Sequence, residues 1–379
     1  MSKVKFSDVV VRANTKEDRH NTDLEFYVGG EHIDTDEVVI EKRGLIAGST
    51  IGPMFYFGFK SGQVLLVSRN PHLRKAGMVT FDGICSEKTF VLETKDESIL
   101  LQRYLPFILQ SDHFWTYAEA HKSGSVNFFI NWSTLVEYEF ELPGIQRQKE
   151  LADVLWAITE TRRSYKRLIA ATDELVKSHF NEMFGNVEEK LYLKDCCTLH
   201  ARVGWQALKK DEHQDTGDYM LITGTDFKDG KVDYSTCVYV SKERYEMDPY
   251  IQVQDGDILI TKDGTIGKVA IVEGLPKPAT LNAGVFVVRP DGRFNVGYFS
   301  YLFKGPIFAD FVDASKTGST IKHLNQAKLL KYESPAAKQD KQEEFASLYA
   351  QSDRSKAEIE ASLSRLTAAY KSVLAENFS

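Results

Sequence analysis

The sequence is poor in cysteine and proline, and its hydrophobic residues do not gather in long runs. It has 4 cysteines and 10 prolines among 379 residues. Cys85, Cys196, Cys197 and Cys237 show no C-x-x-C spacing, which predicts reduced thiols and neither a disulfide framework nor a zinc site. No apolar run approaches the ~20 residues that span a bilayer, and no signal-peptide core follows Met1. We therefore expect a cytoplasmic protein without a membrane segment.

Catalytic motifs are also missing. There is no H-E-x-x-H and no G-x-S-x-G. Gly264-Thr-Ile-Gly267-Lys268 looks like part of a phosphate-binding loop, but Val269 stands where the motif needs serine or threonine. Nothing in these patterns predicts a catalytic or metal-binding residue.

Two fragments resemble enzyme motifs only in part. Asn70-Pro71-His72-Leu73 resembles the N-P-P-[YF] motif of amino-methyltransferases but lacks the second proline and the aromatic residue. Asp82 with Glu93-Thr94-Lys95 could be read as the D…E-x-K core of a metal-dependent nuclease, which the equivalent part of the second half lacks. We predict that the chain is not an enzyme.

What is present is a long amphipathic stretch from Pro143 to Gly185. No proline or glycine lies between Gln146 and Phe184. Apolar residues recur at helical spacing, which predicts one helix of ~55–60 Å that must bury its stripe against a partner. The stripe comprises Leu151, Val154, Leu155, Ile158, Tyr165, Leu168, Ile169, Thr172, Leu175, Val176 and Phe180. A second stripe near the C-terminus comprises Phe345, Leu348, Ile359, Leu363, Leu366, Tyr370, Val373, Leu374 and Phe378.

The two stripes are copies related by a shift of 194 residues, which places Leu151 on Phe345. The same shift holds outside the helices, where Gly62-Gln-Val-Leu-Leu falls on Gly256-Asp-Ile-Leu-Ile and Asn131 on Asn325. The chain is therefore an internal duplication. It predicts an α+β fold with two β-rich recognition domains, residues 1–142 and 187–335. Two long spacer helices, residues 143–186 and 336–379, would pair antiparallel about a pseudo-two-fold axis.

Two equivalent domains carried by a pair of helices suit a duplex DNA target with two separated half-sites. The net charge of −7 excludes a uniformly basic surface, so the contacts must come from local segments. Residues 55–81 and 121–132 contain no Asp or Glu, nor do residues 315–332. Cations with hydroxyl and amide side chains are the groups that contact phosphates and base edges. The predicted DNA-binding residues are Lys60, Arg69, Asn70, Arg74, Lys75, Lys122, Ser123, Ser125, Asn127, Lys262, Thr265, Lys268, Lys316, Thr317, Ser319, Thr320, Lys322 and His323. Taken singly, each segment is better explained as a solvated turn; the prediction of DNA binding rests on both halves carrying the same feature at the same offset.

The whole chain resembles the specificity (S) subunit of type I restriction-modification systems. The start of each long helix carries part of the resemblance, as Leu142-Pro143 with Gln146 and Gln148, and as Ser334-Pro335 with Gln339 and Gln342. The long helices themselves, which end at Phe184 and Phe378, also match. So does the segment Gly256–Leu259 with Thr265–Lys268 in the second half. In the first half the resemblance also includes Asn70-Pro71 and Phe81–Ser86. The first half carries Ser68–Lys75 where the second has its glycine-rich turn.

The resemblance implies that the chain reads a bipartite, asymmetric target in double-stranded DNA, with the helix pair fixing the unread spacer. It also implies two modification subunits that hold S-adenosylmethionine, and two restriction subunits that use ATP with Mg²⁺. The chain itself would bind no cofactor and no metal. Trp156, Arg163 and Lys166 are expected on the exposed face of the first helix, as candidates for partner contact.

Two other functions remain open from the sequence. One is DNA recognition in a related methylation or phage-defence system that has no translocating nuclease. The other is a scaffold whose duplicated domains bind proteins. A DNA-binding protein should lose affinity steeply as salt rises, which distinguishes it from the scaffold.

Overall fold

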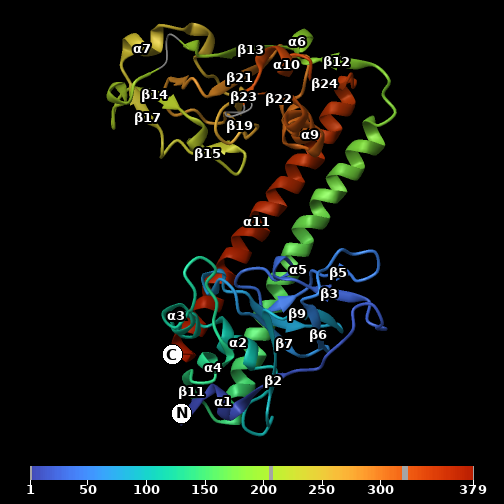
Figure 1. Cartoon of the computed structure of the whole chain (residues 1–379). Coiled ribbons are helices and arrows are strands. Elements are labelled where there is room, and N and C mark those ends of the chain that lie inside the picture. Colours follow the sequence, from blue (N-terminus) through green and yellow to red (C-terminus); the bar gives the residue numbers. More distant parts are fainter. Residues whose placement is uncertain (1, 205–207, 318–322, 379) are drawn as a thin grey trace. The chain divides into compact units, whose positions relative to one another are not determined.

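A computed structural model describes residues 2–204, 208–317 and 323–378. The chain forms two compact units. Unit 1 contains Met1–Leu168 and Ile359–Ser379, and unit 2 contains Ile169–Glu358. Each unit thus combines a β-rich part with one segment from each of two long helices (Figure 1). These helices are α5 (Ile145–Phe184) and α11 (Gln339–Asn377).

Unit 1 is built on two sheets, a five-stranded one in the order β2-β10-β7-β8-β4 and a four-stranded one in the order β5-β3-β9-β6, with a small β1-β11 pair. Its strands are β1 (Ser2–Lys5), β2 (Val10–Ala13), β3 (Phe26–Val28), β4 (Val39–Ile40), β5 (Gly44–Leu45), β6 (Phe55–Phe59), β7 (Val64–Val67), β8 (Ala76–Val79), β9 (Gly83–Ser86), β10 (Thr89–Thr94) and β11 (Glu139–Leu142). Its short helices are α1 (Phe6–Val9), η1 (Gly30–His32), η2 (Pro71–Leu73), α2 (Leu105–Gln110), α3 (Asp112–Ala120) and α4 (Trp132–Leu135).

Unit 2 repeats this plan with a six-stranded sheet, β13-β21-β18-β19-β16-β15, a three-stranded sheet, β17-β14-β20, and the pairs β12-β24 and β22-β23. Its strands are β12 (Lys190–Tyr192), β13 (Cys197–Ala201), β14 (Tyr219–Ile222), β15 (Phe227–Lys228), β16 (Lys231–Val232), β17 (Val238–Val240), β18 (Ile258–Thr261), β19 (Val269–Ile271), β20 (Ala279–Leu281), β21 (Val285–Pro290), β22 (Lys316–Thr317), β23 (His323–Leu324) and β24 (Glu333–Pro335). Its helices are α6 (Leu193–Cys196), η4 (Lys210–Glu212), η5 (Gly224–Asp226), α7 (Lys242–Glu246), η6 (Pro249–Ile251), α8 (Val296–Lys304), α9 (Pro306–Ser315) and α10 (Gln326–Leu329).

Strand pairing confirms the predicted duplication. In the larger sheets, β7 pairs with β10 as β18 pairs with β21, with Val64 opposite Leu92 and Ile258 opposite Val288, so that β21 is offset by 196 residues and β18 by 194. The parallel pairs recur as well, because β4 runs parallel to β8 as β16 does to β19, and β3 runs parallel to β9 as β14 does to β20. The repeat is not complete, because β15 extends the larger sheet of unit 2 alone and β6 is found in unit 1 alone. Where unit 1 has β6, unit 2 has the turn η6, since Pro249 has no N–H to donate to a sheet.

Each unit buries one segment of α5 against one segment of α11, and within each unit the two segments are antiparallel. In unit 1, Arg147 donates to Asn377 Oδ1 at 3.1 Å, and the Arg162 guanidinium lies 5.1 Å from the Tyr370 ring centre. The residue numbers rise along one helix as they fall along the other. In unit 2, Lys356 lies 2.5 Å from Asp173, and Phe180 packs edge-on against Phe345 with ring centres 5.3 Å apart. The predicted helix partnership is therefore present in both units.

The apolar stripe predicted on the first helix is partly wrong. Leu151, Leu155, Val176 and Phe180 are buried as expected. Three members are instead well exposed: Val154 at 50%, Leu168 at 49% and Leu175 at 61%. The buried face runs through Ala152, Thr159 and Arg162, because the helix packs against the β-rich part of unit 1 as well as against α11. The periodicity of hydrophobic residues does not identify polar residues, such as Thr159 and Arg162, that are buried in the helix interface.

The three side chains expected on the exposed face of the first helix contact unit 1 instead. Trp156 Nε1 donates to the Arg103 carbonyl at 2.8 Å. Arg163 forms ion pairs with Glu41 and Glu160, and Lys166 pairs with Glu37. Hydrogen bonds from Arg163 and then Arg167 hold the pKa of Glu41 below its usual value. These side chains tie the recognition part of unit 1 to α5.

Candidate nucleic-acid interface

A buried glutamine joins each long helix to the β-rich part of its unit. Gln148 is fully buried in the first turn of α5. Its Oε1 accepts the Leu101 N–H at 3.0 Å, and its Nε2 donates to the carbonyls of Ile99 and Pro143, both at 2.8 Å. The side chain therefore connects the start of the helix to the segment before α2.

Gln342 makes the same three bonds in unit 2. Its Oε1 accepts the Asn295 N–H at 2.8 Å, and its Nε2 donates to Ala337 O at 2.8 Å and to Arg293 O at 3.5 Å. All four positions differ from those of unit 1 by 194 residues. Two of the four glutamines quoted for the family resemblance, Gln148 and Gln342, thus connect each helix to the β-rich part of its unit.

The two acid-free segments of unit 1 lie side by side. The loop that follows β7 is bonded to the loop before α4 through Ile130 N to Ser68 O at 2.9 Å and Asn70 N to Phe128 O at 2.8 Å. Phe129 also forms backbone bridges with Arg69 and Ser123. Residues 68–75 and 121–130, which the sequence predicted separately, therefore form one surface, called here the unit 1 loop pair.

Unit 2 has an equivalent surface, the unit 2 loop pair, made by residues 261–268 together with the described residues 315–317 and 323–324. Leu324 N donates to Lys262 O at 3.0 Å, which matches the bond from Ile130 to Ser68 at the shift of 194. His323 Nδ1 contacts the Asp263 carboxylate and connects the two loops further. The same two stretches of backbone are therefore combined in both units.

Left-handed backbone positions also match between the two loops. Asn70 has φ 51° and its counterpart Gly264 has φ 69°. Arg74 has φ 50° and Gly267 has φ 83°. Both loops therefore begin and end with a left-handed residue, although the loop of unit 1 is one residue longer and contains η2. Unit 2 uses glycine, which adopts this region freely, and unit 1 uses side chains that are held there by their contacts.

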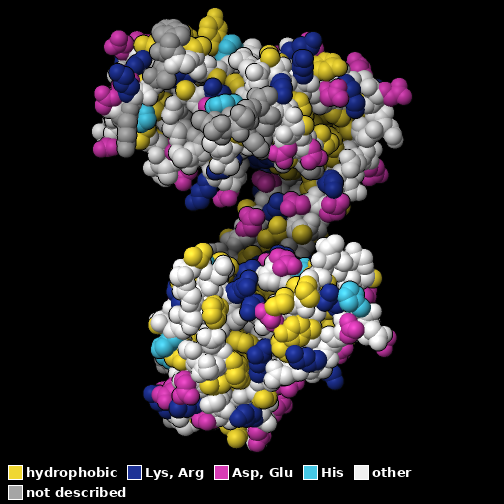
Figure 2. Space-filling model, in the orientation of Figure 1, with side chains coloured by type: hydrophobic (Ala, Val, Ile, Leu, Met, Phe, Trp, Pro, Cys, Tyr) yellow, Lys and Arg dark blue, Asp and Glu magenta, His cyan; other side chains and the backbone are white. Residues whose placement is uncertain are grey.

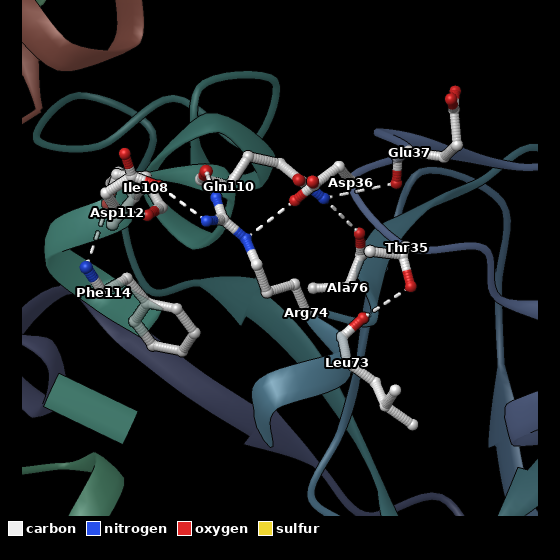
Figure 3. Close-up of polar contacts among 11 residues, drawn as sticks. Thr35, Asp36, Glu37, Leu73, Arg74, Ala76, Ile108, Gln110, Asp112 and Phe114 are labelled. Atoms are coloured by element: carbon white, nitrogen blue, oxygen red, sulfur yellow. Dashed lines mark hydrogen bonds and ion pairs between the residues drawn. The ribbon is translucent and has the colours of Figure 1, made fainter. Parts of the chain in front are cut away.

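Arg74 is held by contacts inside unit 1 (Figure 3). Its guanidinium lies 2.7 Å from Asp36 and 2.6 Å from Asp112, and it donates to the Gln110 carbonyl at 3.0 Å. Gln110 in turn donates to Ala76 O at 2.6 Å. The charge of Arg74 is therefore matched within the protein, and this predicted DNA-binding residue belongs to the scaffold of the loop.

A groove with a volume of about 430 Å³ lies beside the unit 1 loop pair. Arg69, Asn70 and Lys75 line it, together with Met54 and Leu73, which are 46% and 37% exposed. Lys75 Nζ donates to Gly30 O at 2.5 Å on its wall. Lys and Arg side chains lie next to hydrophobic ones on the visible face of unit 1, with acidic side chains among them (Figure 2). The groove combines cations, an amide and apolar surface.

The other predicted residues of unit 1 are spread more widely. Lys60 is exposed at the start of the β6–β7 turn, at the opposite end of β7 from Arg69. Lys122 pairs with Glu119 at 2.6 Å and lies over the Phe128 ring. Ser125 and Asn127 are exposed at the tip of the second loop, and Ser123 is half-buried. The loop pair thus gathers the predicted residues except Lys60.

In unit 2, Thr265 and Lys268 are exposed on the glycine turn. Lys262 is half-buried, 3.8 Å from Asp263 and 5.8 Å from the Phe286 ring centre. The backbone of Lys316 and Thr317 forms β22 opposite His323 and Leu324. The side chains of these two residues, and Ser319, Thr320 and Lys322 altogether, lie outside the described part of the chain. Asp263 is a member of this surface that the search for basic and polar residues missed.

Within the described residues, no group of three or more His, Cys, Asp or Glu side chains is placed to hold a metal ion. The four cysteines are free thiols. Among the described helices, none has the length and apolarity to cross a bilayer. The loop pairs offer hydroxyls, amides and cations, which are groups for binding phosphates and base edges.

Comparison with known proteins agrees with the fold. Residues 189–365 match the family model of the type I restriction modification DNA specificity domain. The structure of a type I restriction-modification S subunit from M. genitalium matches with a TM-score of 0.64 at 14% identity, over 100% of this chain and 96% of that chain. A structure described for complex assembly and conformational transition of the type I R-M system matches with a TM-score of 0.52 at 17% identity, over 98% and 96%. No curated protein matches the sequence significantly.

Proposed function

We propose that this chain is the DNA-specificity subunit of a type I restriction-modification system, without catalytic activity of its own, and that each unit reads one half of a split DNA sequence. The match of residues 189–365 to the DNA specificity domain and the full-length structural match to an S subunit support this proposal. The loop pairs carry this proposal. The same two backbone stretches meet in both units, through Ile130 to Ser68 and through Leu324 to Lys262. Both pairs place polar and cationic side chains on a surface, as DNA contacts require. A duplicated reader of this kind suits two half-sites on one duplex.

The two long helices are proposed to set the number of unread base pairs between the half-sites. Each is a single uninterrupted helix of 40 or 39 residues, or ~60 Å at ~1.5 Å per residue. The buried glutamines hold the start of each helix against its recognition part. A change in helix length would then change the spacing without changing which bases are read.

The proposed partners are two modification subunits and two restriction subunits. In this assembly the modification subunits hold S-adenosylmethionine and methylate adenine at N6, and the restriction subunits use ATP with Mg²⁺. Val154 in unit 1 and Leu175 in unit 2 are exposed apolar side chains on α5. Exposed large apolar residues on a helix are suited to docking a protein partner. We place the modification subunits there.

The test is to map N6-methyladenine across the genome of the source cell with and without this gene. The expected result is one asymmetric motif with two short half-sites and a spacer of fixed length, which disappears on deletion. An unchanged methylation pattern after deletion would contradict the proposal. A continuous motif without a spacer would contradict the two-reader arrangement.

A further inference from the structure

One position in the loop pairs carries opposite charges in the two units. Arg69 follows Ser68, whose carbonyl accepts from Ile130, and Asp263 follows Lys262, whose carbonyl accepts from Leu324. The two positions are related by the shift of 194 residues. They therefore occupy the same place on the same backbone framework, directly after the equivalent strands β7 and β18.

Arg69 is exposed and lines the 430 Å³ groove of unit 1. Among the described residues its guanidinium forms no ion pair at bonding distance. The carboxylate of Glu87 lies in its vicinity and is paired with Lys88 at 2.7 Å; Lys88 first, and Arg69 less strongly, hold the pKa of Glu87 below its usual value. Met54 and Leu73 flank the same groove with exposed apolar surface. Arg69 thus differs from Arg74, whose donors are satisfied inside the unit.

Asp263 presents a carboxylate at the equivalent place, with 37% of its side chain exposed. His323 Nδ1 contacts one of its oxygens and orients the group. Lys262 lies 3.8 Å from the other oxygen. A carboxylate has about four lone-pair sites, so these neighbours leave acceptor capacity facing outward.

We propose that Arg69 and Asp263 are equivalent specificity-determining residues that read different bases in the two half-sites. Arginine donates two hydrogen bonds to O6 and N7 of guanine, a pattern that other bases do not offer in the major groove. A carboxylate accepts from an exocyclic amino group, N4 of cytosine or N6 of adenine, and repels the acceptors of guanine. Unit 1 therefore selects guanine at this position, and unit 2 selects an amino-bearing base. This inference rests on the proposed function.

The test uses the full chain expressed with its partner subunits, and methylated sites are mapped for wild type, Arg69→Ala and Asp263→Asn. Arg69→Ala should relax one base position in one half-site, with discrimination at that position falling ~5- to 150-fold. Asp263→Asn should relax one position in the other half-site only. Ser61→Ala and Asp255→Asn, an equivalent pair of exposed residues at the far ends of β7 and β18, are the matched controls and should leave both half-sites unchanged.

If Arg69→Ala abolishes methylation, binding of the purified complex to duplexes changed at one base pair at a time gives the same readout, with Arg69→Lys alongside. Unchanged discrimination at every position for either variant overturns the inference. Relaxation of both half-sites by one substitution also overturns it. A wild-type map without two half-sites would instead refute the proposed function, so the two failures are distinguishable.

Discussion

Units 1 and 2 share a hydrogen-bonding framework but fill it with different side chains. In unit 1, Gln63 accepts the Lys60 N–H at 2.7 Å and donates to Glu93 at 2.5 Å. In unit 2 the equivalent Asp257 accepts the Gln254 N–H at 2.7 Å. Its partner is Arg289, which follows Val288 on β21 as Glu93 follows Leu92 on β10, and which binds both carboxylate oxygens at 2.7 Å. Val288 pairs with Ile258 as Leu92 pairs with Val64, so the same place in the strand pairing holds an amide–carboxylate contact in unit 1 and an ion pair in unit 2.

The comparison separates two kinds of position. Gln148 and Gln342 are identical and make the same bonds, because they fix how each helix starts. Arg69 and Asp263 differ in charge at the same place on the surface. Positions that hold the framework keep their geometry, and the two positions that we propose to face DNA differ in charge between the units. The predictions below test this division, from the largest effect to the smallest.

Gln148 and Gln342 should contribute equally to the stability of their units. Gln148→Leu or Gln342→Leu leaves one N–H and two carbonyls buried without a partner, which we expect to destabilise the unit concerned by ~3 kcal/mol. Hydrogen–deuterium exchange measures the loss at each junction separately. Gln146→Leu, on the exposed face next to Gln148, is the control and should change little. A large effect in one unit alone would contradict their equivalence.

The ion pair of unit 2 should tolerate truncation less well than its counterpart. Arg289→Ala leaves the buried charge of Asp257, which is 1% exposed, without its cation, and we expect a loss of ~3 kcal/mol. Glu93→Ala leaves only the neutral amide of Gln63, and ~1 kcal/mol is expected. Chemical denaturation of both variants checks the order. Equal losses would show that the charge difference has no energetic consequence.

The left-handed turn should respond in opposite directions in the two units. Gly264→Ala places a Cβ at φ 69°, where open space around it leaves only the backbone cost, ~1 kcal/mol. Asn70→Gly removes such a cost and should stabilise unit 1 by less than ~1 kcal/mol, because glycine also loses entropy on folding. Thermal unfolding measures both. A destabilised Asn70→Gly variant would show that the asparagine side chain contributes to the fold.

Removal of a single exposed lysine from a loop pair should have the smallest effect, a modest loss of affinity for DNA. Lys268→Ala is expected to weaken duplex binding several-fold for every sequence and to reduce the slope of log affinity against log salt by ~1, if its ammonium contacts phosphate. Lys149→Ala, an exposed lysine on α5, is the control. An unchanged slope for Lys268→Ala would place this lysine outside the DNA contact.

Much of the architecture could be predicted from the sequence because the duplication supplies its own internal comparison. Gly62 and Gly256 fall at the same turn, and both have φ 89°. The second helix stripe also agrees, since Phe345, Tyr370 and Leu374 are buried. Hydrophobic periodicity and the internal repeat can both be read from the sequence without knowing how the side chains pack.

The candidate site was less predictable, because its geometry depends on contacts between distant segments. Arg74 and Arg69 are both cations in an acid-free stretch, but only the fold brings Asp36 and Asp112 to Arg74. Trp156 was expected on an exposed helix face, but packing against Phe107 and the bond to Arg103 O make it part of unit 1. Asp263 was overlooked because a search for cations ignores acids. Each miss concerns which partner a side chain meets.

The account depends most on the claim that the units read the half-sites and the helices set the distance between them. The direct measurement is the methylation map of a variant with four residues inserted in α5 after Leu168 and four in α11 after Glu358, at the points where the two compact units divide. Four helical residues add ~6 Å, or about two base pairs at ~3.4 Å each. The account predicts the same two half-sites with a spacer about two base pairs longer. Altered half-sites with an unchanged spacer would contradict it.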